Sequence, residues 1–229
     1  VENNHISVLD TIKGYVGVSL PVGSFRLQIL RRTLPVLAQN NDASCYQIEN
    51  DMRLVEFHSK ANALRPQTIE ILKYVADNPG RGVIIHNDAQ HFSAGVDLNH
   101  FRALIETKKW QEIDDFLAEF QQAVVALKYL NVPVVGAPSG LAIGGGFEVL
   151  AHCDALVAHV NSTFGLVESG VGLLPAGGGV KQTYLRWFNK TGDWNQAAWQ
   201  CWMQIGYGKI GTSPELSARY CYFLDDMDR

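Results

Sequence analysis

Two short apolar runs and one longer periodic segment set the pattern in the first half of the chain. Residues 52–59 (MRLVEFHS) and 82–87 (GVIIHN) are rich in β-forming residues and predict two strands. Between them, residues 65–78 (RPQTIEILKYVADN) place apolar side chains at the spacing of one helix face. Together these segments predict a strand, a helix and a second strand.

The same alternation continues further along the chain. Residues 108–130 predict the strongest helix, because their apolar side chains recur at steps of three and four and form one stripe: Trp110, Ile113, Leu117, Phe120, Val124 and Leu127. Residues 132–138 (VPVVGAP) predict a strand, residues 144–146 (GGG) open a further helix, and residues 154–160 (DALVAHV) predict another strand. Strands that alternate with helices favour an α/β fold.

The two ends of the chain differ from this middle part. Residues 1–50 show no clear period, and we expect an ancillary segment or an interdomain linker there. Residues 51–185 carry the core. Residues 186–229 are rich in Trp, Gln and Asn and predict a helical C-terminal region, in which Ser213 caps a helix that starts at Pro214. Because the chain begins with Val, we expect that it is a piece of a longer protein. We also expect that the helical C-terminal region is truncated.

Composition excludes several classes of protein. The formal net charge is −4 and 18% of the residues are charged, which argues against a nucleic-acid partner. No apolar run is long enough to cross a bilayer, and no secretory segment opens the chain. The four cysteines lack metal-ligand spacing and are too few for a disulfide framework, so we expect reduced thiols, no metal site and a cytoplasmic location.

One acidic residue, Glu148, follows the glycines of residues 144–146 in an otherwise apolar helix. A strand, glycines and a helix start leave backbone N–H groups free, and glycine lets a ligand approach them closely. The simplest alternative is a tight turn followed by a helix acid with no further task. The apolar neighbours of Glu148 argue against a solvated position, so it is a candidate general acid or base.

Two further segments carry candidate chemistry. Glu168, in STFGLVESGVGLLPAGGG, also lies among glycines and apolar residues, although alone it is interpreted more simply as a loop acid. Two such acids allow one to hold water while the other moves a proton. The loop HFSAGVDL can expose backbone N–H groups between Phe92 and Leu98. His152 follows Glu148 at a spacing that could bind metal, but the wider motif is missing and a core position is favoured.

Together these segments resemble the enoyl-CoA hydratase/isomerase (crotonase) family. The resemblance is clear over residues 52–184 and weaker to Leu224, and it lies in KANAL, HFSAGVDL, VPVVGAPSGLAIGGGFEVLAHCD and STFGLVESGVGLLPAGGG, in that order. LVEFHSKANAL and GKIGTSPELSARYCYFL resemble more narrowly the hydratase domains that are fused to a 3-hydroxyacyl-CoA dehydrogenase domain. The resemblance implies a spiral of repeated strand-strand-helix units, a helical C-terminal region and a trimer or a multiple of it.

The resemblance also implies roles for particular residues. Main-chain N–H groups of Val96 and Gly145 would form an oxyanion hole, and Glu148 and Glu168 would be the two catalytic acids. The segments that match the substrate- and CoA-binding positions of the family contribute Ala61, Ala94, Gly95, Val96, Asp97, Leu98, Asn99, Gly144 and Gly145. Asn99 stands where many relatives have lysine, so a phosphate contact is not carried over to it.

The expected function is that of an enoyl-CoA hydratase in fatty-acid oxidation (β-oxidation) or a related acyl-CoA pathway. Coenzyme A would be part of the substrate, and no separate cofactor is expected. Two alternatives stay open. One is an isomerase or acyl-CoA hydrolase of the same fold, and the other is a non-catalytic module that binds acyl-CoA or holds an oligomer together within a longer chain.

Overall fold

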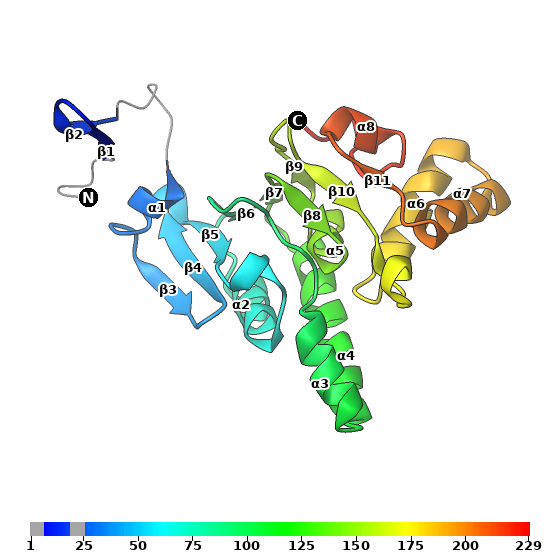
Figure 1. Cartoon of the computed structure of the whole chain (residues 1–229). Helices are drawn as coiled ribbons and strands as arrows, with labels where there is room; N and C mark the ends of the chain where they lie inside the picture. The colour runs from blue at the N-terminus through cyan, green and yellow to red at the C-terminus, as the bar shows by residue number, and fades with distance from the viewer. Residues whose placement is uncertain (1–6, 19–25) are drawn as a thin grey trace.

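The computed structural model describes residues 7–18 and 26–229, and within them two sheets and a set of helices form an α/β fold (Figure 1). The larger sheet has the strand order β3-β4-β5-β6-β7-β9. Its strands are β3 (Val36–Gln39), β4 (Ala43–Ile48), β5 (Met52–Phe57), β6 (Val83–His86), β7 (Val134–Ala137) and β9 (Ala155–Leu156). The smaller sheet has the order β11-β10-β8 and consists of β8 (Leu141–Ile143), β10 (Thr163–Gly165) and β11 (Ile210–Gly211). Near the N-terminus, β1 (Ser7–Asp10) and β2 (Gly14–Gly17) pair as a hairpin.

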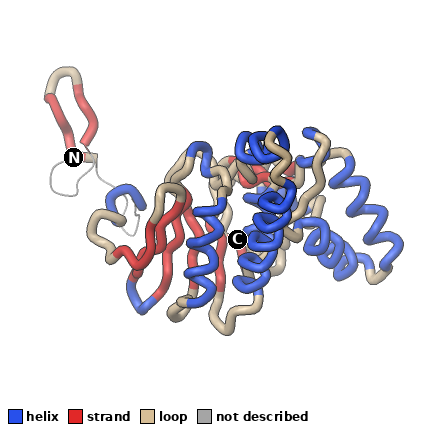
Figure 2. Tube along the Cα trace, turned by 90° about the horizontal axis from the view of Figure 1, so that it is seen from below, coloured by secondary structure: helices blue, strands red, loops and turns tan. Residues whose placement is uncertain are grey.

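Helices follow the strands, as the sequence pattern predicts. They are α1 (Leu27–Leu30), α2 (Pro66–Asp77), α3 (Leu98–Glu106), α4 (Trp110–Lys128), α5 (Gly145–Ala151), α6 (Gly179–Thr191), α7 (Trp194–Gly206) and α8 (Pro214–Ala218). Figure 2 shows the larger sheet with helices packed beside it and the C-terminal helices at the far end from the hairpin. The α/β prediction is therefore confirmed.

Successive units of the chain stack in parallel. β6, β7 and β9 run parallel in the larger sheet, and after each of them the chain crosses to a second layer, where Ser93 bridges β8 in parallel and β8 pairs with β10 in parallel. Each crossing is followed by a helix: α3, α5 and α6 respectively. This strand, strand, helix repeat is the spiral that the resemblance implies.

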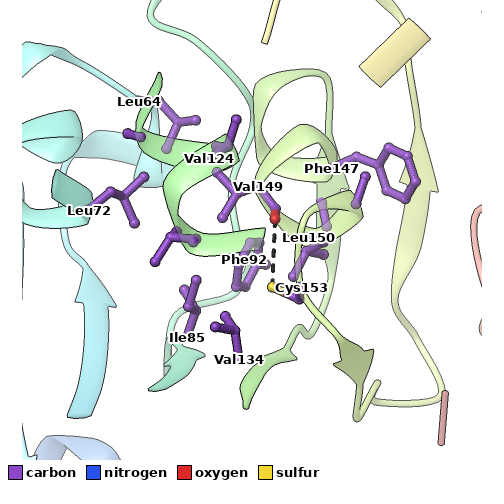
Figure 3. Close-up of a cluster of buried hydrophobic side chains, with 14 of the residues drawn as sticks. Leu64, Leu72, Ile85, Phe92, Val124, Val134, Phe147, Val149, Leu150 and Cys153 are labelled. Atoms are coloured by element: carbon purple, nitrogen blue, oxygen red, sulfur yellow. Dashed lines mark hydrogen bonds between the residues drawn. The ribbon is translucent and has the colours of Figure 1, made fainter. Parts of the chain in front are cut away.

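The main core lies between the sheet and helices α2, α4 and α5 (Figure 3). Val134 of β7 and Ile85 of β6 are fully buried, as expected for parallel strands covered by helices. On α5, Phe147, Val149 and Leu150 are also fully buried, and every residue of this helix is buried, Glu148 included. The four cysteines are free and buried, Cys153 within this core.

The C-terminal region is helical, as predicted. Ser213 caps α8 by accepting a hydrogen bond from the backbone N–H of Leu216 at 3.2 Å. The C-terminal region contacts the rest of the fold through Tyr222, which follows α8 and is fully buried. Its hydroxyl accepts a hydrogen bond from the N–H of Leu166 at 3.2 Å.

The sheet does not end at residue 50, where the sequence pattern sets the start of the core. β4 pairs with β5 in antiparallel register from Ala43–Phe57 to Ile48–Met52, so residues 36–48 belong to the main sheet rather than to an ancillary segment. The turn between these strands holds Asn50 and Asp51 at φ 58° and 58°, in the left-handed region that Asn and Asp tolerate best after glycine. That turn chemistry was not recognised in the sequence.

Candidate active site

A cavity of about 440 Å³ opens where the second layer meets helices α3, α4 and α5. The two predicted catalytic acids and both predicted oxyanion residues line it: Glu148, Glu168, Val96 and Gly145. Ala94, Gly95, Leu98 and Gly144 line it as well. Most of the predicted site residues therefore meet at one place, although they come from three separate segments of the chain.

The loop before α3 is held between two segments. On one side, the N–H of Ser93 donates to Leu141 O at 2.9 Å, which ties the loop to β8. On the other side, Ala94 N–H donates to Ala61 O at 3.2 Å, and Leu64 N–H donates to Gly95 O at 2.8 Å. The KANAL segment and β8 thus fix the backbone of HFSAGVDL from opposite sides.

Two main-chain N–H groups lie free beside each other at the cavity. A Cβ atom added at Gly145 would lie 3.4 Å from the amide nitrogen of Val96, and one added at Gly95 would lie 3.3 Å from the amide nitrogen of Gly145. Within residues 26–229, neither the Val96 N–H nor the Gly145 N–H donates a hydrogen bond. Buried or half-buried amides are normally paired, so these two donors are available to a ligand.

Glu148 is buried in the first turn of α5, with 2% of its surface exposed. Its Oε1 accepts a hydrogen bond from the N–H of Gly179 at 2.8 Å. Burial raises the pKa of Glu148 to about 7. The hydrogen bond from Gly179 lowers this pKa in part, and the nearby charge of Glu168 raises it further. The carboxyl group is thus poised to exchange a proton near neutral pH.

Glu168 begins the 3₁₀ helix η3 (Glu168–Val171) and lines the same cavity. A Cβ atom on Gly144 would lie 3.3 Å from Glu168 Oε1, so this carboxyl group lies next to the first glycine triplet, residues 144–146. Its Oε2 is buried without a hydrogen-bond partner among the described residues. Burial raises the pKa of Glu168 above its ordinary value.

The second glycine triplet, residues 177–179, has a role that the sequence analysis missed. A Cβ atom at Gly177 would lie 2.6 Å from Glu148 Oε2, and one at Gly179 would lie 2.9 Å from Glu148 Oε1. Only glycine leaves room for the carboxyl group there, and the Gly179 N–H supplies its hydrogen bond. A second triplet before a helix was visible in the sequence, but nothing local linked it to Glu148.

Three of the predicted CoA-binding residues lie outside the described cavity wall. Ala61 is exposed, has φ 56°, and accepts the Ala94 N–H through its carbonyl. Asp97 caps α3 by accepting the Asn99 N–H at 3.0 Å, and its carboxylate pairs with Arg65 at 2.6 Å. Burial works against the ionised form of Asp97, but the hydrogen bonds from Arg65 and Asn99 outweigh it and lower its pKa. The side chain of Asp97 is therefore engaged in holding the loop.

The long apolar stripe predicted on residues 108–130 divides into two parts. Phe120, Val124 and Leu127 are buried in the core, as expected for a stripe that faces the protein interior. Trp110 and Ile113 instead line the cavity, and Trp110 keeps 59% of its surface exposed. The sequence pattern identified the face of the helix but not what covers each part of it.

His152 is buried at the C-terminal end of α5, as favoured from the sequence. Its Nδ1 lies 2.7 Å from the carbonyl oxygen of Glu148, and burial lowers the pKa of His152 to about 4. The ring is therefore neutral at ordinary pH, donates to the helix backbone, and does not reach the carboxyl group of Glu148 as a partner.

Solved structures place this fold in a known class. An enoyl-CoA hydratase from Bacillus anthracis superposes with a TM-score of 0.67 at 20% identity, over 82% of this chain and 70% of that one. A Thermobifida fusca protein solved in complex with acetoacetyl-CoA gives a TM-score of 0.67 at 18% identity, over 80% and 72% of the two chains. The fold is therefore the crotonase fold with C-terminal helices.

The sequence narrows this class to one family. The family model described as enoyl-CoA hydratase/isomerase matches residues 47–193, and the chain belongs to that family. A Bacillus subtilis protein named "Probable 3-hydroxyacyl-CoA dehydrogenase" is 33% identical over 206 residues, which are 89% of this chain and 26% of that protein. The chain thus spans about a quarter of the length of this relative. No helix in the described part of the chain is long and apolar enough to cross a membrane.

Proposed function

We propose that the chain is an enoyl-CoA hydratase unit, which adds water across the double bond of a 2-enoyl-CoA thioester. One observation carries the proposal: two carboxyl groups with raised pKa and two free main-chain N–H groups line the same cavity. Hydration of a conjugated thioester needs these parts together, a pair of acid-base groups at the double bond and donors at the thioester oxygen.

The free N–H groups of Val96 and Gly145 would bind the thioester oxygen. When water attacks the β carbon, the electron pair of the double bond moves toward this oxygen and an enolate forms. Donors that are already in place stabilise that charge without reorganisation, and loss of one such donor typically costs about 3–4 kcal/mol. The glycines at residues 144–146 let the thioester approach the backbone closely.

The two carboxyl groups would divide the proton transfers. Glu148 accepts the Gly179 N–H, which favours its ionised form, so it is the group that holds the water and takes its proton. Glu168, whose Oε2 is buried without a partner among the described residues, would deliver a proton to the α carbon. After the addition Glu148 holds the proton from water and Glu168 has lost one, so a proton passes from Glu148 to Glu168, directly or by exchange with solvent, before the next turnover. The charge of Glu168 adds to burial in raising the pKa of Glu148.

The remaining predictions extend this proposal to binding and assembly. The CoA part of the substrate would follow Ala61 and the stretch from Asp97 to Asn99, outside the cavity that takes the acyl group. The fused dehydrogenase domain rests on the dehydrogenase name of the Bacillus subtilis relative. A place in fatty-acid oxidation rests on relatives named for a fatty acid oxidation complex, and acyl-CoA binding on the acetoacetyl-CoA complex. A trimeric assembly and a division of the chain near residue 185 remain predictions.

The alternatives differ in what they require of the two acids. An isomerase needs one carboxyl group to move a proton between two carbons, and a non-catalytic module needs neither. Two carboxyl groups that line one cavity and have raised pKa values support hydration over both.

The test is a comparison of three reactions on the same protein preparation. Hydration of crotonyl-CoA is followed by loss of the absorbance of the conjugated thioester, isomerisation by its appearance from a 3-enoyl-CoA, and hydrolysis by release of free thiol. We expect hydration to dominate, and Glu148→Gln and Glu168→Gln each to lower its kcat by about 10³-fold or more.

Other outcomes would replace the proposal. Gain of absorbance from the 3-enoyl-CoA that depends on only one of the two acids would indicate an isomerase. Tight CoA-ester binding without turnover of any of the three substrates would indicate the non-catalytic module.

A further inference from the structure

The wall of the cavity changes character away from the two acids. Among the described residues that line it, Glu148 and Glu168 are the only ones with charged side chains, and no other lining side chain ends in a hydroxyl or amide. The rest of the wall is backbone, aliphatic or aromatic. The cavity therefore has one polar end, where the thioester and double bond would react, and a long apolar remainder.

Helices α3 and α4 each supply a row of apolar side chains to this part of the cavity wall. Leu98, Phe101 and Ile105 lie on one face of α3 at steps of three and four. Facing them, α4 presents a second stripe from Phe120, which touches the Glu148 end, outward through Leu117 and Ile113 to Trp110. At 1.5 Å of rise per residue, this second stripe runs for about 15 Å. Figure 1 shows α3 and α4 lying together as a pair that projects from the core.

The outer end of this apolar cavity wall is open to solvent among the described residues. Trp110 is 59% exposed and Ile105 45%, while Leu174 on the opposite wall is 78% exposed. Exposed apolar surface gathered around one cavity marks a binding surface more often than scattered single residues do. This apolar surface lines the same cavity as Glu148 and Glu168, so the part of a ligand that extends beyond its reacting double bond would cover it.

We infer that this cavity selects 2-enoyl-CoA substrates with a long, uncharged acyl chain, of about eight carbons or more, whose tail lies between the α3 and α4 stripes and ends near Trp110. The inference rests on the proposed function. A crotonyl group, with three C–C bonds of about 1.5 Å, reaches at most about 4.5 Å and leaves most of the stripe uncovered. A ten-carbon chain reaches at most about 14 Å and covers it.

The size of the selection follows from burial of the tail. Each methylene removed from water gains about a fourfold increase in affinity when fully buried, and less in an open groove. Six additional methylenes give at least a 50-fold higher kcat/KM for 2-decenoyl-CoA than for crotonyl-CoA. A tail that ends in a carboxylate meets no cationic side chain on this wall among the described residues, and the indole N–H of Trp110 is the one side-chain donor there, so such a tail is bound less well than an uncharged one.

The experiment measures kcat/KM for three substrates: crotonyl-CoA, 2-decenoyl-CoA and a 2-enoyl-CoA of ten carbons with a terminal carboxylate. The wild-type protein is compared with Trp110→Ala and with Trp199→Ala, a matched control. Trp199 lies on α7, away from the cavity lining, and is also 59% exposed. We expect Trp110→Ala to lower the decenoyl-to-crotonyl ratio about five- to tenfold, and Trp199→Ala to leave it unchanged.

Two results would overturn the inference. One is equal kcat/KM for the four- and ten-carbon substrates, and the other is a decenoyl-to-crotonyl ratio that Trp110→Ala leaves unchanged. Calorimetric binding of butyryl-CoA and decanoyl-CoA separates this inference from the proposed function. If no enoyl-CoA is hydrated but decanoyl-CoA binds at least 50-fold more tightly and Trp110→Ala removes the difference, the hydratase proposal fails and the tail site stands.

Discussion

The two glycine triplets of the chain look alike in sequence but face different partners. Each stands at the start of a helix: Gly145 and Gly146 begin α5, and Gly179 begins α6. In the first triplet, Cβ atoms would meet Ser93, Val96 and the Glu168 carboxyl group, and the Gly145 N–H stays free. In the second, they would meet Glu148 and His152, and the Gly179 N–H is already bound to Glu148.

The difference shows that glycine serves two purposes in this site. The first triplet brings the loop of Val96 against α5 and leaves backbone donors for a ligand. The second makes room for a buried carboxyl group and supplies part of its hydrogen bonding. In the proposed mechanism, the first triplet acts on the substrate and the second acts on the base.

Between the two triplets, the larger effect on activity is expected from the first. A methyl group at Gly146 would lie 2.7 Å from Ser93 Cβ and 2.8 Å from Ser93 O, so Gly146→Ala forces the loop away from α5. We expect about a 100-fold lower kcat for hydration, with a loss of about 1–3 kcal/mol in the free energy of unfolding. Urea denaturation and steady-state kinetics check both values.

The control for this prediction is Gly206→Ala. Gly206 ends α7, and a methyl group there would meet nothing closer than 3.9 Å. It is expected to leave both quantities within experimental error. Equal losses in the two variants would show that the first triplet has no special relation to the site.

The next effect concerns the stability of the buried carboxyl group that the second triplet encloses. The folded-state pKa of Glu148, about 7, lies above its ordinary value of 4.5, so the folded state holds a proton that the unfolded state releases. Stability of the wild-type protein is therefore lost as pH rises from about 4.5 to about 7. Glu148→Gln does not titrate, and its free energy of unfolding relative to wild type should rise by about 2–3 kcal/mol between pH 5 and pH 8.

Denaturant melts at the two pH values measure this difference. Glu215→Gln is the matched control, because Glu215 is exposed on α8. It should show no comparable change between pH 5 and pH 8. A Glu148→Gln difference that stays constant with pH would mean that Glu148 titrates as an ordinary surface acid.

The smallest effect distinguishes the second triplet from the first. A methyl group at Gly179 would lie 2.9 Å from both Cγ and Oε1 of Glu148 and would push the carboxyl group off the Gly179 N–H. Loss of this donor raises the pKa of Glu148 further. In Gly179→Ala, the acidic limb of the pH profile of kcat/KM should move up by about one unit, about a tenfold loss at pH 6. Gly146→Ala should lower the profile without moving this limb, and the opposite pattern would reverse the roles of the triplets.

Sequence patterns anticipated the first triplet better than the second. The apolar residues after residues 144–146 predicted that Glu148 is buried on α5, because burial follows from the local pattern. The link from Glu148 to Gly179 joins two segments that no periodicity connects. Local spacing also could not predict which part of the apolar stripe on α4 is buried. The spacing is uniform from Trp110 to Leu127, but only the inner part of the stripe packs in the core. The pairing of β4 with β5 was missed because the turn at Asn50 gives a weak signal.

The most direct test of the account is a double-mutant comparison of hydration by the wild-type protein, Glu148→Gln, Glu168→Gln and the variant with both changes. Because the two carboxyl groups are proposed to act as one unit, each single variant should lose about 10³-fold or more in kcat. The double variant should then fall within about tenfold of the weaker single one. Near-wild-type hydration by either single variant, or losses that multiply in the double variant, would contradict it.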